Sequence, residues 1–372
     1  MCKKVMTIFG TRPEAIKMCP LINELKSREH IKTIVCVTGQ HREMLDQVLD
    51  IFGIVADYNL TIMKEKQTLF DITMKVLEGV RQVLEKEKPD IVLVHGDTST
   101  TFAAALASYY MHIPVGHVEA GLRTYNIYSP YPEEFNRQAV GIICQYNFVP
   151  TETAKNNLLN EGKSAETIFV TGNTVIDALK TTINSQYTHS ELEWAKNSRL
   201  LLVTVHRREN IGVPMQRIFR AILRIVQNNP DVKVIYPIHM NPTIREQAKD
   251  ILGREDRIHI IEPLDVVSFH NFLNISDMVL TDSGGVQEEA TFLGKPVLVL
   301  RDNTERPEGI DVGVLNVVGT DENLIYEKCN EMLKNRETCK SESQGKSIYG
   351  DGTASVKIAD ILEKGTYCGK NN

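Results

Sequence analysis

The sequence predicts an α/β protein made of two Rossmann-like, doubly wound parallel-sheet domains that face a central cleft. Short β-rich runs alternate with amphipathic helical stretches throughout the chain, which is typical of βα units and parallel sheets. The same alternation begins again in the second half of the chain. A chain of 372 residues is also longer than a domain with a single hydrophobic core usually is. We therefore expect an N-terminal domain over 1–170, a C-terminal domain over 171–352, and a last helix within 353–372 that packs back across the domains.

Strands are predicted where short apolar runs stand between polar turns. Residues 91–95 (IVLVH) are nearly all apolar, as expected for a strand that is covered on both faces. The other predicted strands span 5–9, 33–38, 115–118, 146–149, 200–205, 232–238, 259–261, 278–281 and 296–300. The 3.6-residue period predicts helices over 13–26, 41–52, 70–86, 100–111, 215–228, 243–252, 266–275, 286–293 and 323–335.

Composition excludes several classes of protein. A formal net charge of −6 argues against a nucleic-acid partner, because no broad basic face is available. No run of about 18 apolar residues occurs, so no membrane span is expected, and the short apolar N-terminus does not fit a signal peptide. The seven cysteines lack metal-ligand spacing. We expect a cytoplasmic protein without a metal site.

Polar residues follow the predicted strands of the first half. Arg12 starts a helix, where free amides would face an anion, and Lys17 lies about one turn further along. Asp97, Glu119 and Glu133 come from three neighbouring loops. Because carboxylates that share a pocket shift each other's pKa values, this group suits proton transfer.

These side chains also have structural interpretations. Asp97 fits an N-cap. Glu119 closes an apolar segment, so it needs either a chemical role or a partner such as Arg123, because burying an unpaired carboxylate is costly. Glu133 stands four residues before Arg137, and the two fit an ion pair on one helix face.

The second half supplies cations and backbone amides. His206 and Arg207 follow a predicted strand and are placed to bind phosphate, although a lone histidine is more often structural. The segment 282–296 (DSGGVQEEATFLGKP) is the most specific. Its small residues let backbone amides approach a diphosphate at a helix N-terminus.

Three further residues of this half are candidates for ligand contacts. Glu289, about one turn inside the helix, is a candidate acceptor for a ribose diol. Arg306 lies in a polar loop that is suited to cover the ligand. Phe269 fits either an apolar contact with a base or packing in the core.

The segment 282–296 looks like the nucleotide-sugar loop of the GT-B architecture. With the other motifs, the chain resembles UDP-N-acetylglucosamine 2-epimerase of the bacterial and archaeal, non-hydrolysing type over roughly residues 5–362. The motifs that carry the resemblance are FGTRPE at 9–14, GQH at 39–41, HGDT at 95–98, HVEAG at 117–121, PEE at 132–134 and HRRE at 206–209.

The resemblance implies interconversion of UDP-N-acetylglucosamine and UDP-N-acetylmannosamine for surface polysaccharide synthesis. The family removes the C2 proton, eliminates UDP to leave a 2-acetamidoglucal, and adds UDP back. The implied catalytic residues are Asp97, Glu119, Glu133 and His206. The implied substrate-binding residues are Arg12, Lys17, Arg137, His206, Phe269, Ser283, Gly284, Gly285, Glu289 and Arg306.

The resemblance further implies a homodimer that needs no metal or nicotinamide cofactor. A second UDP-N-acetylglucosamine is expected beside the active site as an allosteric activator. Glu43 and Lys66 stand where some members carry glutamine and arginine, which leaves the strength of activation open. The residues that match the activator site are Gln40, His41, Glu43, Lys66, Glu133, Arg207 and His239.

Other functions stay open at this point. A hydrolysing epimerase would release free N-acetylmannosamine, and the pair Gln40–His41 favours the non-hydrolysing branch. A GT-B glycosyltransferase needs an acceptor site, and three clustered carboxylates exceed what transfer to a hydroxyl requires. A non-catalytic sensor has no reason to keep all three acids. The sequence leaves open the exact sugar and the sugar face on which each carboxylate acts.

Overall fold

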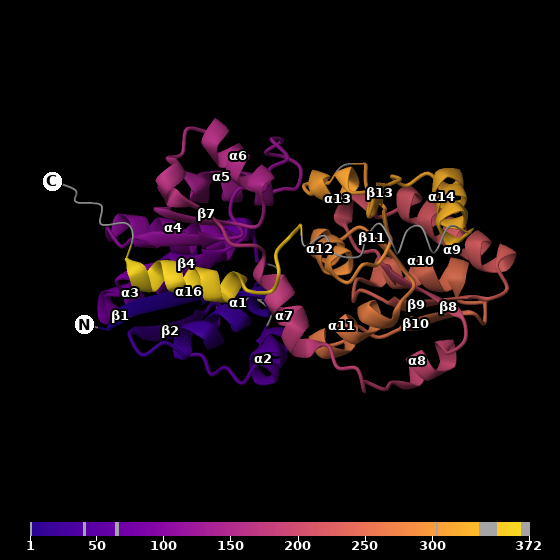
Figure 1. Cartoon of the computed structure of the whole chain (residues 1–372), viewed down its shortest axis with the longest axis horizontal. Coiled ribbons are helices and arrows are strands. Elements are labelled where there is room, and N and C mark those ends of the chain that lie inside the picture. The colour runs from indigo at the N-terminus through magenta and orange to yellow at the C-terminus, as the bar shows by residue number, and fades with distance from the viewer. Residues whose placement is uncertain (1, 40–41, 64–66, 303, 335–347, 366–372) are drawn as a thin grey trace. The chain divides into compact units, whose positions relative to one another are not determined.

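The computed structural model describes residues 2–39, 42–63, 67–302, 304–334 and 348–365 (Figure 1). Contacts divide the chain into two compact units. The first unit comprises Met1–Lys180 and Tyr349–Asn372, and the second, Thr181–Ile348, is inserted into it. Each unit contains one parallel sheet with interleaved helices, which confirms the predicted α/β class with two doubly wound sheets.

The sheet of the first unit has seven strands in the order β3-β2-β1-β4-β5-β6-β7. All neighbouring strands pair in parallel. The strands are β1 (Lys3–Phe9), β2 (Ile31–Val37), β3 (Tyr58–Asn59), β4 (Ile91–His95), β5 (Val115–Val118), β6 (Tyr146–Val149) and β7 (Ile168–Val170). The helices are α1 (Arg12–Lys26), α2 (Arg42–Ile51), α3 (Leu69–Glu87), α4 (Ser99–Tyr110), α5 (Glu133–Ile143), α6 (Glu152–Asn160), α7 (Thr174–Thr182) and α16 (Ala354–Lys364).

Strand order reverses between β1 and β4, which pair from Val5↔Ile91 to Ile8↔Val94. At such a switch point the loops after the two strands diverge, and doubly wound sheets bind ligands there. Helices α3, α4 and α5 pack together, whereas α1 packs with α2 and α16. The switch point therefore lies at the strand ends of a sheet that is covered by two groups of helices.

The second unit has a six-stranded sheet in the order β10-β9-β8-β11-β12-β13, again parallel throughout. Its strands are β8 (Arg199–Thr204), β9 (Val232–Pro237), β10 (Ile258–Ile261), β11 (Met278–Thr281), β12 (Val297–Val299) and β13 (Leu315–Val317). Its helices are α8 (Ser190–Ala195), α9 (Val213–Asn228), α10 (Pro242–Leu252), α11 (Val266–Ile275), α12 (Gly284–Phe292), α13 (Pro307–Asp311) and α14 (Glu322–Lys334).

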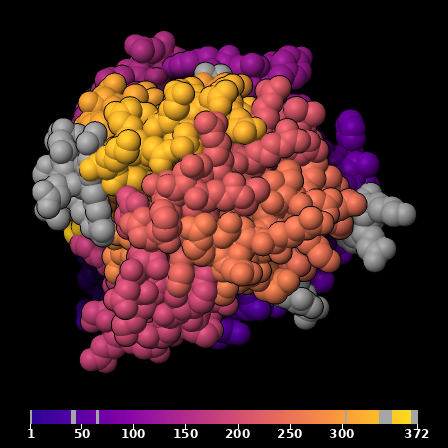
Figure 2. Space-filling view, turned by 90° about the vertical axis from the view of Figure 1, so that its right-hand side faces the viewer, coloured from indigo at the N-terminus to yellow at the C-terminus, as the bar shows by residue number. Residues whose placement is uncertain are grey.

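The second switch point lies between β8 and β11, which pair from Leu201↔Met278 to Thr204↔Thr281. Helix α9 packs against α10 and α14. Figure 2 shows the face of this unit on which the yellow-orange α14 is exposed, with the segment before β8 at the lower left. A separate apolar cluster that includes residues of α8, α11 and α12 packs against the sheet as well. Apolar residues thus bury both faces of the sheet, as a parallel sheet requires.

The chain returns to the first unit at its C-terminal end, where α16 packs on α1 (Figure 1). The Asp177 carboxylate accepts hydrogen bonds from the amides of Ala354 and Ser355, at 3.3 and 2.8 Å, and so satisfies free donors at the start of α16. Lys3 Nζ donates to the carbonyl of Leu362, at 2.9 Å. These contacts join the last helix to the first-unit fold.

The long apolar strands lie within about two residues of their predicted bounds, whereas the short strands β3, β7 and β13 were not predicted. Two or three residues give too few alternating positions for a recognisable pattern. The change of unit falls between Lys180 and Thr181, inside α7. Among the helices of the described residues, none has the length and apolar character needed to cross a bilayer.

Candidate active site

Glu14 joins the two loops at the first switch point. One of its carboxylate oxygens accepts hydrogen bonds from the amides of Gly10 and Thr11, at 3.0 and 2.8 Å. The other accepts from the hydroxyls of Thr98 and Thr101, at 2.8 and 3.1 Å. Burial raises the pKa of Glu14, and these hydrogen bonds act against that rise. Sequence analysis missed this role, although the T-x-x-E spacing is the signature of a capping box.

Glu119 follows β5 and is the buried centre of the first-unit site, with 6% of the residue exposed. Its Oε2 contacts Lys17 Nζ and accepts a hydrogen bond of 2.8 Å from Asn173 Nδ2. Its φ of +63° is a left-handed conformation that side chains rarely adopt and that concentrates at functional sites. The expected alternative partner, Arg123, instead forms two hydrogen bonds with Glu161, at 2.7 and 2.8 Å.

Arg137 links the two predicted acids Asp97 and Glu119. Its Nη2 contacts Asp97 Oδ2 and lies 3.4 Å from Glu119 Oε1, while its Nη1 donates to the backbone carbonyl of Glu119. Asn136, the preceding residue of α5, donates to the carbonyl of Asp97 at 2.9 Å. The half-buried Glu133 starts the same helix one turn earlier.

The structure therefore brings Lys17, Arg137, Asp97 and Glu119 together. Lys17 and Arg137, which the sequence assigned to substrate binding, already neutralise buried carboxylates. Arg12 is half-buried at the first residue of α1. The first unit thus presents acids together with their counter-charges, which is a suitable setting for proton transfer.

Two buried imidazoles border this cluster. Burial lowers the pKa of His95 to about 4 and that of His117 to about 3. His117 Nε2 lies 2.7 Å from the carbonyl oxygen of Gly96, and His95 Nε2 lies 3.8 Å from Glu119 Oε2. Within the described part of the chain, neither ring nitrogen of His95 has a hydrogen-bond partner. Both rings are neutral at physiological pH.

Asp282 organises the second switch point from a fully buried position. Its carboxylate accepts hydrogen bonds from the amides of His206 and Arg207, at 3.0 and 2.9 Å, and from Asn210 Nδ2 at 3.0 Å. The loop after β8 is thereby fixed to the end of β11. The sequence pointed to this segment but did not assign Asp282 a role.

The imidazole of His206 remains accessible, with 39% of the side chain exposed. It stacks on His239, with ring centroids 5.6 Å apart and an interplanar angle of 13°. Burial lowers the pKa of His206, and the Asp282 carboxylate opposes this. Burial therefore favours the neutral form of the His206 imidazole.

The turn at 283–285 leads from β11 into α12. The amide of Ser283 donates to Thr281 Oγ1 at 2.9 Å. The amides of Gly284 and Gly285, in the first turn of α12, have no hydrogen-bond partner among the described residues, so two of the three predicted anion-binding amides are available. Glu289 is buried, and its Oε2 has no hydrogen-bond partner within the same ranges.

Arg306 is buried beside this turn rather than exposed over it. Its Nε donates to Glu288 at 2.6 Å, and its Nη1 lies 3.5 Å from Glu305. Burial raises the pKa of Glu305, but Arg306 and Arg301 outweigh that effect and lower it to about 2. A Cβ on Gly284 would overlap the Arg306 guanidinium, so glycine at this position allows the close approach.

The other predicted residues occupy different surroundings. Phe269 is half-buried and packs in the apolar cluster of α11 and α12. Gln40, His41 and Lys66 lie outside the described residues, as does the side chain of Glu43. No group of three metal-ligating side chains occurs in the ranges that the structure describes.

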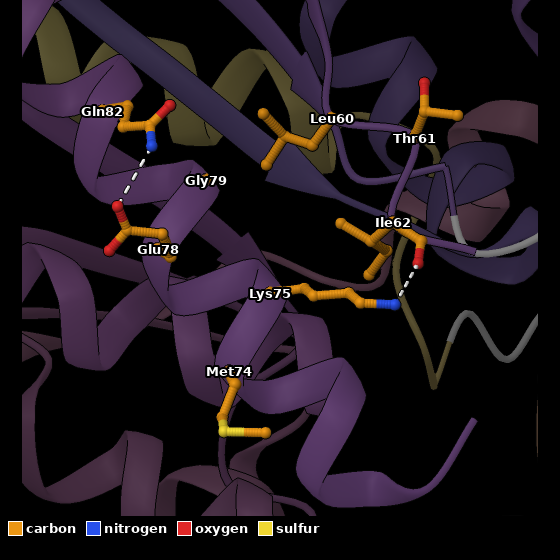
Figure 3. Close-up of a pocket in the computed structure, with 8 residues that line it drawn as sticks. All are labelled: Leu60, Thr61, Ile62, Met74, Lys75, Glu78, Gly79 and Gln82. Carbon is orange, nitrogen blue, oxygen red and sulfur yellow. Dashed lines mark hydrogen bonds between the residues drawn. The ribbon is translucent and has the colours of Figure 1, made fainter. Parts of the chain in front are cut away.

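A separate groove of about 430 Å³ lies between α3 and the segment after β3. Figure 3 shows its lining, in which Lys75 donates to the carbonyl of Ile62 at 3.4 Å. Gln82 donates to Glu78 at 3.0 Å on the helix side. None of the eight lining residues belongs to either switch point. The groove is distinct from the candidate active site.

The two doubly wound sheets, with polar loops at their switch points, place the chain among the GT-B-like α/β proteins. The family model described as UDP-N-acetylglucosamine 2-epimerase matches residues 23–363. A UDP-N-acetylglucosamine 2-epimerase of Bacillus subtilis is 56% identical over 359 residues, which cover 96% of this chain and 94% of that protein. The chain therefore belongs to the UDP-N-acetylglucosamine 2-epimerase family.

Solved structures agree with this assignment. The Neisseria meningitidis UDP-GlcNAc 2-epimerase bound to UDP-GlcNAc is 47% identical, with a TM-score of 0.92 and coverage of 97% of this chain and 100% of that chain. The S. aureus MnaA–UDP co-structure is 50% identical, with a TM-score of 0.93 and coverage of 97% and 96%.

Replacing His117 by asparagine tests the buried neutral imidazole. The unfolded chain protonates this histidine below its ordinary pKa of 6.5, whereas the folded chain does so only near pH 3. Stability is therefore lost as the pH falls through this window. In His117→Asn, the slope of the unfolding free energy against pH, taken between pH 6 and 5, is expected to decrease by the equivalent of about one bound proton. Urea unfolding, followed by circular dichroism at several pH values, measures this slope. Equal slopes in the wild type and in His117→Asn would contradict a buried, neutral His117.

Gly284→Ala tests the contact with Arg306. The added methyl group displaces the guanidinium from Glu288, and we expect a loss of about 2 to 4 kcal/mol in the free energy of unfolding of the second unit. Gly285→Ala is the matched control, because its Cβ would meet no described atom within 4 Å apart from its chain neighbours and the backbone of its own helix. The only tryptophan, Trp194, lies in the second unit, so its fluorescence reports this transition. Equal stability of the two variants would refute the contact.

Proposed function

We propose that this chain interconverts UDP-N-acetylglucosamine and UDP-N-acetylmannosamine without releasing free sugar. The observation that carries the proposal is the buried cluster in which Arg137 links Asp97 to Glu119 and Lys17 contacts Glu119. Inversion at C2 requires proton removal on one face and proton delivery on the other. Two carboxylates joined by one guanidinium suit this exchange.

The proposed reaction proceeds by elimination and re-addition. A base takes the C2 proton, the C2–H electron pair forms the C1=C2 double bond, and UDP leaves with the electron pair of the C1–O bond. The 2-acetamidoglucal is then protonated at C2 on the opposite face while UDP attacks C1. Because the C2 proton is weakly acidic, departure of UDP must assist its removal. Asp97, Glu119 and Glu133 are the proposed acid/base residues.

Each unit has a proposed task in binding. Lys17 and Arg137 keep the acids of the first unit in place, and Arg12 contributes positive charge for the diphosphate. In the second unit, the amides of Gly284 and Gly285 are proposed to bind the diphosphate at the start of α12, with His206 as a further donor. The unpartnered Oε2 of Glu289 suits a ribose hydroxyl.

The relatives support the choice of substrate. The Neisseria meningitidis epimerase is bound to UDP-GlcNAc, and the S. aureus protein is bound to UDP. We propose that Phe269 and Arg306 complete this nucleotide-sugar site, Arg306 by holding the turn at Gly284. The product, an activated N-acetylmannosamine, suits glycosyl transfer into surface polysaccharide. The proposed enzyme acts as a homodimer.

The elimination route predicts solvent hydrogen at C2. In D₂O, UDP-N-acetylglucosamine alone should yield UDP-N-acetylmannosamine with deuterium at C2, as measured by NMR. Asp97→Asn and Glu119→Gln should each lower kcat by about 100-fold or more, because a general acid/base contributes this much. UDP binding should change little in both variants.

Three results of that experiment would overturn the proposal. Product without deuterium would exclude elimination. Release of free N-acetylmannosamine would assign the chain to the hydrolysing branch. A strict need for an acceptor would indicate a glycosyltransferase.

We further propose that a second UDP-N-acetylglucosamine activates the enzyme through a site that includes Arg207 and His239. The stack of His239 on His206 supports this, because it joins a residue of the proposed activator site to one of the proposed catalytic site. Glu133, Gln40, His41, Glu43 and Lys66 are the remaining proposed contacts.

Activation predicts a sigmoidal dependence of rate on UDP-N-acetylglucosamine concentration. His239→Phe keeps an aromatic ring for the stack but removes the ring nitrogens, so it should weaken the sigmoidal response while catalysis at saturation persists. Initial rates over a range of substrate concentrations measure both effects. A hyperbolic response of the wild-type enzyme would contradict activation.

A further inference from the structure

Asn173 lies between β7 and α7 and is 2% exposed. Its Nδ2 donates to Glu119 Oε2 at 2.8 Å, on the same oxygen that Lys17 contacts. The two donors come from parts of the chain that are far apart in sequence. Glu119 Oε2 is therefore held from two directions.

The orientation of the Asn173 amide is fixed by its other contacts. Its Oδ1 accepts a hydrogen bond from the amide of Val175 at 3.1 Å, in the manner of an N-cap of α7. A flipped amide would lose this bond and would place an oxygen against the Glu119 carboxylate. The amide nitrogen must therefore face Glu119.

The C-terminal return of the chain holds the backbone of Asn173. Its N–H donates to the carbonyl of Tyr349 at 2.7 Å, and Tyr349 is itself buried. Gly172 and Gly350 pack so closely that a Cβ on Gly172 would lie 2.8 Å from the Gly350 Cα. Both glycines have positive φ, of +89° and +119°, which favours glycine at these positions.

We propose that Asn173 is a positioning residue that aims the Glu119 carboxylate at the sugar carbon during epimerisation. This inference rests on the proposed function, in which Glu119 exchanges a proton. A neutral amide can donate to Glu119 in either protonation state, so it can keep the carboxyl group oriented through the whole cycle. Lys17, by contrast, favours the ionised form.

The charged and titratable groups around Glu119 include Lys17 on α1, Arg137 on α5, His95 at the end of β4 and Asp97 in the loop that follows. None of these changes in a substitution at Asn173. A shift in the pH profile of Asn173→Asp therefore reports the charge that this variant places beside Glu119.

Two substitutions separate this contact from the helix cap. Asn173→Ser keeps an acceptor for the Val175 amide but is too short to reach Glu119. It should lower kcat by about tenfold to 100-fold, because small misplacements of a reacting group have effects of this size, and it should leave KM within about twofold. Asn173→Asp keeps the acceptor and places a second carboxylate against Glu119. The like charge disfavours ionisation, so the apparent pKa of Glu119 in the pH–rate profile should rise by about one unit.

The matched control is Asn147→Ser. Asn147 is a fully buried asparagine on β6, in the same sheet, and its amide donates to the Thr167 carbonyl at 3.2 Å. This variant should lose thermal stability without a shift in the pH profile. Rates are measured from pH 5 to 9 alongside melting temperatures for all variants.

The outcomes distinguish this inference from the proposed function. The positioning role is supported if Asn173→Asp shifts the profile and Asn173→Ser lowers kcat more than Asn147→Ser does. It is overturned if the wild type epimerises with C2 deuteration but Asn173→Asp has an unchanged profile, or if Asn173→Ser matches the control. A wild type without epimerisation would overturn the proposed function and this inference together.

Discussion

The pairing of the buried Glu119 carboxylate is the constraint on which the first unit depends. An ion at such a position is tolerated only with counter-charges and hydrogen bonds in place. Lys17 comes from α1, Arg137 from α5 and Asn173 from the segment before α7. Three separate parts of the chain must therefore fold correctly before the carboxylate is satisfied. The same contacts that make the burial possible also fix the geometry of the proposed chemistry.

The second unit also contains a buried carboxylate, but this carboxylate has a different kind of hydrogen-bond partner. Asp282 is also buried, but its carboxylate accepts hydrogen bonds from two backbone amides and from the side-chain amide of Asn210, with the His206 imidazole 3.6 Å away. A carboxylate that is held mainly by the backbone fixes a loop and leaves the nearby side chains available. The His206 side chain keeps 39% of its surface exposed, and the first-turn amides of α12 have no hydrogen-bond partner among the described residues. This contrast is consistent with the proposed division, in which the first unit transfers protons and the second unit binds the diphosphate.

Sequence reasoning identified the strands with long apolar runs and, with them, the polar loops that follow. It failed where a strand was too short to show an apolar pattern, or where two residues in contact are far apart in the sequence. Asn173 was missed because β7 is only three residues long, so the loop after it was not recognised as a strand end. Arg123 was expected near Glu119 because the two are close in sequence, but it pairs with Glu161 across space. Sequence analysis assigned Lys17 and Arg137 to substrate binding, and offered Glu133 as an ion-pair partner of Arg137, but it did not indicate that both side chains contact Glu119.

The return of the chain at Tyr349 has a consequence for biosynthesis. Domains usually fold in order as they leave the ribosome. Here the residues that supply α16 and the carbonyl for Asn173 are translated after the whole second unit. The first unit is thus completed only after the second, and a nascent chain that ends after α14 would have a finished second sheet while the backbone of Asn173 still lacks its contact with Tyr349.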